Sequence, residues 1–527
     1  MKKVLSLFLL FMLVLSTSIS GNIVKAKEQF KDLSSVKWAE DAIYYLNDRG
    51  VINGYGNGKF GPNDKITREQ AALMLVRELY PNEKSTTKLP FKDVKTDSFY
   101  YNAIAVAVDH GLFEGYPDGT FKPKDPITRA ATSKIIALAY KLNGTNGYFT
   151  DLNKASWAVS FIKALASNNI VNGYDDGTFK PNNTITRAEF SLSFARVLDE
   201  KFKPAPNLYA HFIDVGQGDS IFIQTPAGKT ILVDGGKKDA GPKVVSYIQN
   251  EGVKSIDLLV ATHPDADHIG GLVDVLKNIP VKQVLDSGKE HTTQTYLEYL
   301  QLIDTKNIPF KVAQTGENIN LDSNVKITVL NSGEGQTDNN EASVVLKITY
   351  GDMDILLTGD AETEQEKAML SRFNIEADIY KAAHHGSNTG NSLEFLRAVS
   401  PKATVLSYGK DNSYGHPHQE VVQRLQQVGS KIYSTADSGS IVFTVSKTSF
   451  TVTAKPWSGG TEPVPNPTPT PDPKPTPEPG LEVIPGAPTS FANCTEMREY
   501  YPNGVKKGHP AYETKHDRDN DGWACER

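Results

Sequence analysis

The stretch Thr262-His263-Pro264-Asp265-Ala266-Asp267-His268-Ile269-Gly270-Gly271 decides the fold of the middle of this chain of 527 residues. The apolar run at 256–262 predicts a buried strand that leads into this stretch, and the spacing of apolar residues at 272–277 predicts a helix directly after it. Upstream, three further strands and a helix are predicted between residues 208 and 250. This alternation predicts a layered α/β domain.

Four side chains that can bind a metal crowd the predicted turn between strand and helix. Alternation along an extended segment puts His263, Asp265 and Asp267 on one side, and His268 begins the helix within reach of the same point. A dense set of His and Asp without cysteine is typical of a hydrolytic zinc or manganese centre. The alternative is an Asp-rich capped turn with exposed histidines.

Three later polar segments also stand where a predicted strand gives way to a loop, a usual place for functional residues. They are Thr358-Gly359-Asp360, His384-His385-Gly386-Ser387 and Gly415-His416-Pro417. Lys381 and Lys410 are surface candidates for contact with a phosphate group.

Together these segments resemble the metallo-β-lactamase superfamily over residues 207–456, and within it the ComEC-like branch. The matching segments lie at 214–219, 233–236, 262–271, 357–360, 384–387 and 415–417. The resemblance implies an αββα sandwich with a site for two divalent metal ions, Zn or Mn, along one edge.

The resemblance also implies a role for each candidate residue of the two-metal centre. His263 and Asp265 hold the first metal, Asp267 and His268 the second, Asp360 bridges the two, His385 completes the second site, and Asp234 orients a ligand histidine.

Two departures from the superfamily pattern bear on the metal. Asp265 stands where a second His is usual, and the His usual before the Gly-Asp segment is missing. Asn339, Asn340 and Ser343 occupy that region instead. ComEC-like members share both features. A more oxygen-rich set of ligands is expected to favour Mn over Zn and to weaken the first site.

The expected chemistry is metal-assisted hydrolysis, in which the metal lowers the pKa of bound water toward ~7. His384 and His416 are spare imidazoles that can steady charge or protonate a leaving group; with the ligand Asp267 they are the predicted catalytic residues. Two alternatives stay open: His384, rather than its neighbour, is the ligand, and His416 makes only a structural hydrogen bond near Pro417.

The amino-terminal part contains three copies of one unit, predicted at 28–88, 89–146 and 147–205. Each opens with Phe-x-Asp, continues with Gly-Tyr and ends in Ile-Thr-Arg before a helix. These features resemble the S-layer homology repeat, which implies a pseudo-threefold helical unit that binds an anionic, pyruvylated secondary cell-wall polysaccharide.

The candidates to pair with sugar carboxylates are Arg68, Arg129 and Arg187. Alternatively, each Arg braces its own repeat. The second repeat lacks counterparts of Glu69 and Glu189, so its groove is expected to be weaker.

The two ends of the chain predict export and a small final module. Residues 1–26 resemble a cleaved secretory signal, the alternative being an uncleaved anchor, and no later segment of the sequence is expected to span a membrane.

A Pro-rich spacer at 457–489 precedes a module at 490–527 that resembles the excalibur calcium-binding family. The implied calcium ligands are Asp517, Asp519, Asp521 and Glu526; an acidic turn without an ion is the alternative. Cys494 and Cys525 are expected to form a disulfide rather than remain free thiols.

The whole pattern predicts a multidomain enzyme secreted to the cell wall of a Gram-positive-type bacterium. The net charge of −6 gives no broad basic surface, so bulk charge does not predict nucleic-acid binding. The ComEC-like resemblance nevertheless implies a phosphodiesterase or nuclease that acts on DNA. Alternatives are a phosphodiesterase for teichoic acid or phosphocholine groups, a weaker lactone or ester hydrolase, and a wall-bound binding protein without catalysis.

Overall fold

The computed structural model describes residues 30–459, 481, 483–484, 486–518 and 521–525. The predicted signal at 1–26, and Asp519 and Glu526 of the predicted calcium loop, lie outside these residues. The chain forms two compact units, one ending at Gly459 and one beginning at Gly460. Within the described residues, no helix has the length and apolarity needed to cross a bilayer.

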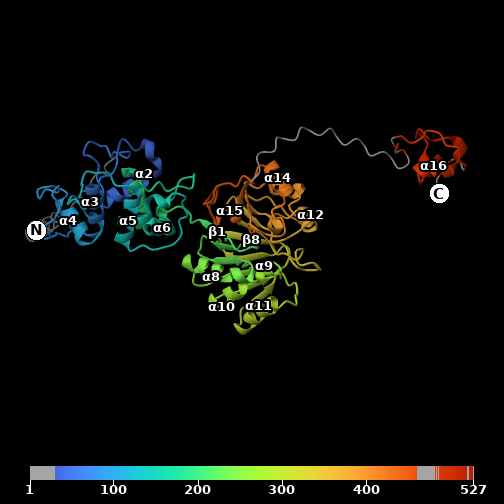
Figure 1. Cartoon of the computed structure of the whole chain (residues 1–527). Helices are drawn as coiled ribbons and strands as arrows, with labels where there is room; N and C mark the ends of the chain where they lie inside the picture. Colours follow the sequence, from blue (N-terminus) through green and yellow to red (C-terminus); the bar gives the residue numbers. More distant parts are fainter. Residues whose placement is uncertain (1–29, 460–480, 482, 485, 519–520, 526–527) are drawn as a thin grey trace, which may run out of the picture. The chain divides into compact units, whose positions relative to one another are not determined.

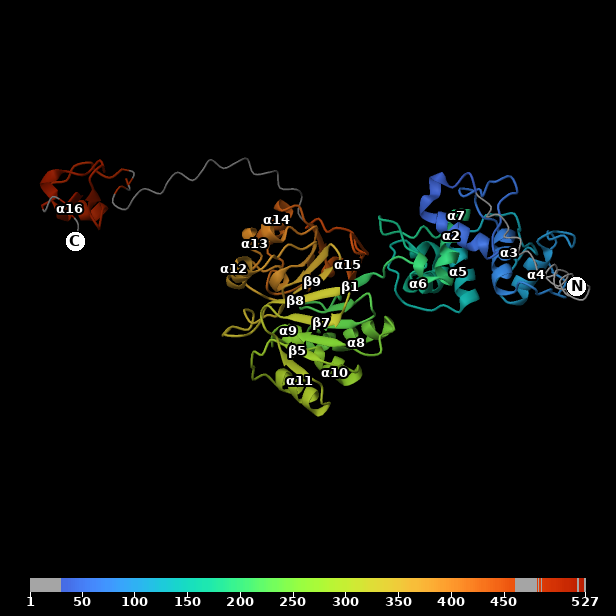
Figure 2. The same cartoon turned by 180° about the vertical axis from the view of Figure 1, so that it is seen from behind.

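The three repeats form one helical body in which the second helix of each repeat packs on the first helix of another. The helices are α2 (Lys37–Asp48), α3 (Arg68–Leu79), α4 (Tyr101–Asp109), α5 (Arg129–Tyr140), α6 (Val159–Ser167) and α7 (Arg187–Leu198), with short turns η1 (Ser34–Val36), η2 (Leu152–Ala158) and η3 (Glu200–Phe202). Helix α3 packs on α4, α5 on α6, and α7 returns to α2 (Figures 1 and 2). The threonine before each Arg caps the second helix of its repeat.

A closed ring of backbone hydrogen bonds joins the three repeats. Ile66 N donates to Ile185 O at 3.2 Å, Ile185 N donates to Ile127 O at 3.1 Å, and Ile127 N donates to Ile66 O at 3.0 Å. All three isoleucines are buried. Because equivalent residues bond in a circle, the repeats are related by a pseudo-threefold axis, as the resemblance implied.

Two stacked sheets form the centre of the following domain. The first has the order β15-β14-β1-β2-β3-β4-β5-β6, and the second has the order β13-β12-β11-β10-β9-β8-β7. The strands of the first are β1 (Leu208–Phe212), β2 (Ile221–Gln224), β3 (Thr230–Val233), β4 (Leu258–Ala261), β5 (Val284–Asp286), β6 (Phe310–Val312), β14 (Ile441–Val445) and β15 (Phe450–Val452). Those of the second are β7 (Asn318–Asp322), β8 (Val325–Asn331), β9 (Val345–Tyr350), β10 (Met353–Leu357), β11 (Ile379–Lys381), β12 (Ala403–Leu406) and β13 (Lys431–Ser434).

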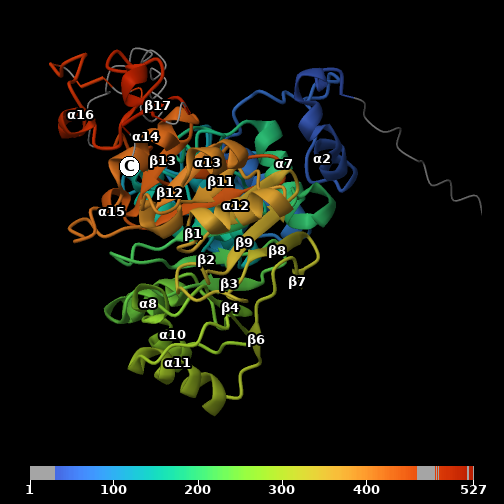
Figure 3. The same cartoon turned by 90° about the vertical axis from the view of Figure 1, so that its right-hand side faces the viewer.

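Helices cover the outer face of each sheet, so the layers run αββα and the predicted fold class is confirmed (Figure 3). The first sheet carries α8 (Gly241–Asn250), α9 (Ala266–Ile269), α10 (Leu272–Asn278) and α11 (Gln294–Thr305), and the second carries α12 (Thr363–Arg372), α13 (Leu393–Val399), α14 (Gln419–Gln427) and α15 (Thr435–Ser438). Alternate residues explain the layering: Val260 of β4 lies between the sheets, whereas Leu259 packs toward the helices.

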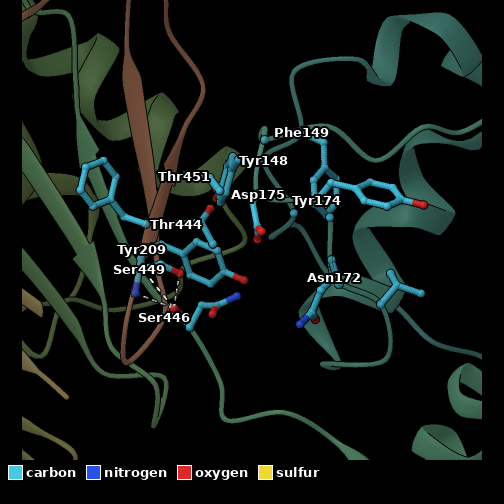
Figure 4. A pocket seen from close by; sticks show the side chains of 17 residues that line it. Tyr148, Phe149, Asn172, Tyr174, Asp175, Tyr209, Thr444, Ser446, Ser449 and Thr451 are labelled. Atoms are coloured by element: carbon cyan, nitrogen blue, oxygen red, sulfur yellow. Dashed lines mark hydrogen bonds between the residues drawn. The ribbon is translucent and has the colours of Figure 1, made fainter. Parts of the chain in front are cut away.

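A hollow lies beside the third repeat, lined on one side by Tyr148 and Tyr174 and on the other by Tyr209 and Thr451 of the sandwich (Figure 4). The Tyr148 hydroxyl donates a hydrogen bond to the carboxylate of Glu251, at the end of α8. Partly buried aromatic and polar groups therefore link the repeats to the sandwich within the first unit.

The second unit is small and stapled by a disulfide between Cys494 and Cys525. It contains α16 (Cys494–Tyr500), β16 (Val505–Lys506), η6 (Thr514–His516) and β17 (Trp523–Ala524). Few apolar side chains are buried here, among them Phe491 and Met497. A crosslink is the usual way in which so small a core is held.

Candidate metal centre

The candidate ligands gather at one edge of the sandwich because each follows the carboxyl end of a strand. His263 follows β4, Asp360 follows β10 and His385 follows β11. Strands β3, β4 and β5 are parallel, as are β10, β11 and β12. Parallel strands end at a common edge, so segments far apart in the sequence deliver their loops to one place.

Glycines let the loops of this edge approach one another closely. Gly235 N donates to His268 O at 2.7 Å, and a Cβ atom on Gly271 would lie 2.0 Å from Gly235 O. A Cβ atom on Gly218 would lie 2.2 Å from Asp267 O. Neither position has space for a side chain, which explains why the glycine-containing segments accompany the His and Asp residues.

Three ligand side chains converge on the carboxylate of Asp360. Its Oδ2 atom lies 3.3 Å from His268 Nε2 and 3.4 Å from His385 Nε2. His385 Nε2 is also 3.5 Å from Asp267 Oδ2. Donor atoms of His263, His268 and Asp360 lie within 4.8 Å of one another, as do those of Asp267, His268 and His385. Asp360 belongs to two such groups, one with His263 and His268 and one with Asp219 and His385.

The donor atoms of this cluster are buried and lack hydrogen-bond partners within the described residues. They are the Nε2 atoms of His263, His268 and His385 and the Oδ1 atom of Asp360. Buried polar atoms are nearly always paired, so their convergence fits a bound cation. Imidazole nitrogens and carboxylate oxygens without thiolate suit Zn or Mn.

The outer nitrogens of two histidines are held by acceptors, which turns the inner nitrogens toward the cluster. His268 Nδ1 lies 2.8 Å from Asp234 Oδ2, and His385 Nδ1 lies 2.9 Å from the Ser407 carbonyl oxygen. Burial lowers the pKa of His268, but the charges of Asp360 and Asp234 outweigh it and raise this pKa well above its usual value. The carboxylates therefore make this edge strongly attractive to positive charge.

Asp265 lies at the margin of the cluster. Its Oδ2 atom is 3.8 Å from His263 Nε2, and its Oδ1 atom accepts a hydrogen bond of 2.7 Å from Asn339. Within the described part of the chain, no compact group of three ligands includes Asp265. Ser343 Oγ lies 3.3 Å from His263 Nδ1 and accepts from the backbone N–H of Asp360. The segment that replaces the usual His thus braces predicted ligands.

His384 and His416 line the cluster on its outer side. His384 Nε2 lies 3.7 Å from Asp360 Oδ2, and its side chain is 22% exposed, whereas that of His385 is 1% exposed. The rings of His384 and His416 are 5.4 Å apart. Burial and the neighbouring His385 lower the pKa of His416 to about 4. His385 makes the closer contacts, which leaves the two other imidazoles beside the cluster.

The sequence-based interpretation of Lys381 as a surface residue is wrong. Lys381 is fully buried at the end of β11, and its Nζ atom lies 2.9 Å from Asp219 Oδ2. Asp219, which received no role from the sequence, belongs to two of the compact ligand groups. The available signals were the position of Asp219 in the matching segment 214–219 and a lysine that ends an apolar strand. Lys410 is exposed, as expected.

The guanidinium of each predicted wall-binding Arg contacts a neighbouring repeat rather than its own. Arg68 Nε donates to Phe121 O of the second repeat at 2.8 Å, and its guanidinium lies 5.0 Å from the Tyr116 ring. Equivalent hydrogen bonds join Arg129 to the third repeat and Arg187 to the first. The grooves are therefore composite.

The described part of the predicted calcium loop is already ordered by backbone contacts. Asp517 Oδ2 accepts from Gly522 N at 3.0 Å, and Asp521 Oδ1 accepts from Trp523 N at 2.9 Å.

Comparisons with known proteins agree with the three parts of the chain. Residues 213–410 match the model of the metallo-beta-lactamase superfamily. The middle of the chain is thus similar in sequence to that superfamily. Residues 29–72, 90–132 and 148–191 match the S-layer homology domain, and residues 491–526 match the Excalibur calcium-binding domain. The S-layer homology repeats indicate a cell-wall-anchored extracellular protein.

Two curated relatives match different parts. ComE operon protein 3 of Bacillus subtilis is 31% identical over 250 residues, which are 44% of this chain and 32% of the relative. The Surface-layer 125 kDa protein of Lysinibacillus sphaericus is 33% identical over 184 residues, 33% of this chain and 15% of the relative. The chain thus spans a third or less of the length of either. Among solved structures, the metallo hydrolase Igni18 of Ignicoccus hospitalis is similar, with 15% identity, a TM-score of 0.31 and coverage of 45% of this chain and 98% of that one.

Proposed function

We propose that this protein is a wall-anchored, metal-dependent phosphodiesterase. Its proposed substrate is a polymeric phosphodiester, with DNA as the preferred candidate. The observation that carries the proposal is the convergence of three unpaired imidazole nitrogens on the carboxylate of Asp360. DNA as the substrate is supported by the resemblance to the ComEC-like branch.

Five residues are proposed to hold two divalent ions: His263, Asp267, His268, Asp360 and His385. Asp265, at the margin, is proposed to complete the first site. When bound, such ions supply a water of lowered pKa and stabilise charge on phosphate oxygens. The backbone and carboxylate acceptors keep the imidazoles in the tautomer that can coordinate.

His384 and His416 are proposed to handle the proton of the leaving oxygen. His384 is the more accessible of the two and lies beside Asp360, so it can reach a bound phosphodiester and donate a proton. His416 is held neutral by burial and lies next to His384, so it can orient that ring.

The three composite grooves are proposed to bind an anionic cell-wall polysaccharide. In one, Arg68 of the first repeat, Tyr116 of the second and Trp157 of the third line the same hollow. In another, Arg187, Tyr55 and Phe99 do so. Trp157 and Phe99 are 56% and 73% exposed. A cation for carboxylates beside an exposed ring for sugar faces suits this ligand class.

The proposal is tested by incubating the purified protein with Mn or Zn and with DNA, RNA or teichoic acid, beside an Asp360→Ala variant. Cleavage of DNA that requires metal and Asp360 supports the proposal. Preferential cleavage of teichoic acid or of phosphocholine groups would assign the wall polymer as the substrate instead. Retention of a ligand without turnover of any polymer would indicate a binding protein.

A further inference from the structure

An ion pair without access to solvent lies directly behind His385. Lys381 Nζ is 2.9 Å from Asp219 Oδ2, and the two side chains are 0% and 1% exposed. Removing two charges from water is costly, and apolar residues of similar volume stabilise a core at least as well. A role in the neighbouring cluster of ligands therefore explains the ion pair better than a contribution to the stability of the core.

Asp219 faces the outer nitrogen of His385. Its Oδ1 atom lies 3.4 Å from His385 Nδ1, whereas His385 Nε2 is turned to Asp267 and Asp360. The Nδ1 proton therefore lies close to two acceptors, the Ser407 carbonyl oxygen and the Asp219 carboxylate. An anionic acceptor at the outer nitrogen makes the inner nitrogen a stronger metal ligand.

The backbone of Asp219 ties together other segments that form the metal centre. Asp219 N donates to Asp267 O at 3.2 Å, and Asp219 O accepts from Gly236 N at 2.8 Å. The same residue thus contacts the metal-binding loop and the turn after β3 through its backbone, and the segment after β11 through its side chain.

The negative charge at this edge explains why a lysine is buried there. Four of the carboxylates at this edge belong to compact groups of potential ligands: Asp219, Asp234, Asp267 and Asp360. Lys381 is fully buried beside one of them, Asp219. Its ammonium group therefore offsets part of the negative charge that the carboxylates bring to the edge.

We propose that Asp219 and Lys381 are positioning residues of the metal centre. Asp219 orients His385 and strengthens its inner nitrogen as a ligand, and Lys381 balances the charge of Asp219 so that the carboxylate can be buried there. This inference rests on the proposed metal centre but not on the identity of the polymer that is cleaved.

The test is calorimetric titration of the full, chelator-stripped chain with Mn²⁺ and, separately, with Zn²⁺. The double variant Asp219→Asn/Lys381→Met carries the test, because it leaves no unpaired buried charge, whereas either single variant risks misfolding. We expect the double variant to keep a cooperative unfolding transition and to bind Mn²⁺ about 10- to 100-fold more weakly. Its matched control is Asp354→Asn/Lys347→Met, an ion pair of 3.0 Å in the same sheet, which should leave Mn²⁺ binding unchanged.

Wild-type affinity in the Asp219/Lys381 double variant would overturn the inference and leave the phosphodiesterase proposal standing. Weakened Mn²⁺ binding in that variant, together with a wild type that cleaves no phosphodiester, would support the inference and overturn the proposed function. A wild type that binds neither Mn²⁺ nor Zn²⁺ would overturn both.

Discussion

Asp234 Oδ2 lies 2.8 Å from His268 Nδ1, and both side chains are fully buried. Asp234 also accepts hydrogen bonds from the backbone N–H and the hydroxyl of Thr262, immediately before the metal-binding loop. One carboxylate therefore sets both the ring orientation of a predicted ligand and the start of the loop that carries the others.

Replacing Asp234 with Asn should weaken metal binding about tenfold. Asn keeps an acceptor and tolerates the left-handed backbone of this residue, where φ is 59°, so the fold should survive. The variant therefore tests the effect of removing the negative charge beside His268. Titration with Mn²⁺ measures it, and Asp257→Asn, at the far end of β4, serves as the control. Equal affinity in the Asp234 variant and the wild type would contradict this role.

Chelation should abolish hydrolysis, and Mn²⁺ should restore more activity than Zn²⁺. The ligand set combines three imidazoles with several carboxylates, and Asn339 rather than a His stands beside Asp265. Oxygen-rich sites of this kind shift preference toward Mn²⁺. The measurement is the rate of DNA cleavage after chelator removal and addition of each metal. Stoichiometric tight Zn²⁺ with no activation by Mn²⁺ would speak against the expectation.

Arg68→Lys and Arg187→Lys should each weaken binding to isolated cell walls about tenfold, equivalent to roughly 1.4 kcal/mol. Lysine keeps the charge but cannot reproduce the two hydrogen bonds that each guanidinium donates to backbone carbonyls of the neighbouring repeat. Arg129→Lys should have a smaller effect, because the second repeat lacks the acidic neighbours of the other two.

Co-sedimentation with purified walls measures this series. Arg196→Lys is the matched control, since Arg196 also donates to backbone carbonyls but lines neither of the two grooves that contain Arg68 and Arg187. A loss in Arg196→Lys as large as in Arg68→Lys would mean that folding rather than the groove is affected.

Acid should destabilise the first unit partly through His211. Burial lowers the pKa of this histidine to about 3, whereas the unfolded chain titrates near 6.5. Below about pH 6.5 the unfolded state takes up a proton that the folded state does not. The free energy of unfolding that His211 contributes at neutral pH therefore decreases by about 1.4 kcal/mol for each pH unit of acidification. The groups facing His211 are Tyr247 at 3.0 Å, the Tyr148 ring and Lys163.

Urea unfolding at about pH 7.5 and about pH 5.5 tests this prediction against His211→Gln. The variant does not titrate in this range, so its loss between the two values should be smaller by about 1.4 kcal/mol. Parallel losses in both proteins would show that His211 contributes nothing to the acid sensitivity.

Local patterns were enough to predict a layered α/β domain and the loop that carries candidate ligands, whereas the αββα sandwich followed from the resemblance to a known superfamily. The apolar run at 256–262, the dense His and Asp residues after it and the glycines that follow are properties of adjacent residues, and they define a strand, a turn and a helix. The three repeats were equally visible, because Phe-x-Asp, Gly-Tyr and Ile-Thr-Arg recur in order.

Contacts between distant segments were decided only by the tertiary structure. Lys381 looked like a surface lysine, yet the pairing of β11 in the middle of the sheet buries it against Asp219. The sequence left open whether each groove Arg braces its own repeat, and helix packing brings its guanidinium against the next repeat. The physical reason is the same in both cases: sequence periodicity tells which face of an element is apolar, whereas burial of a charge depends on which partner the fold brings to that face.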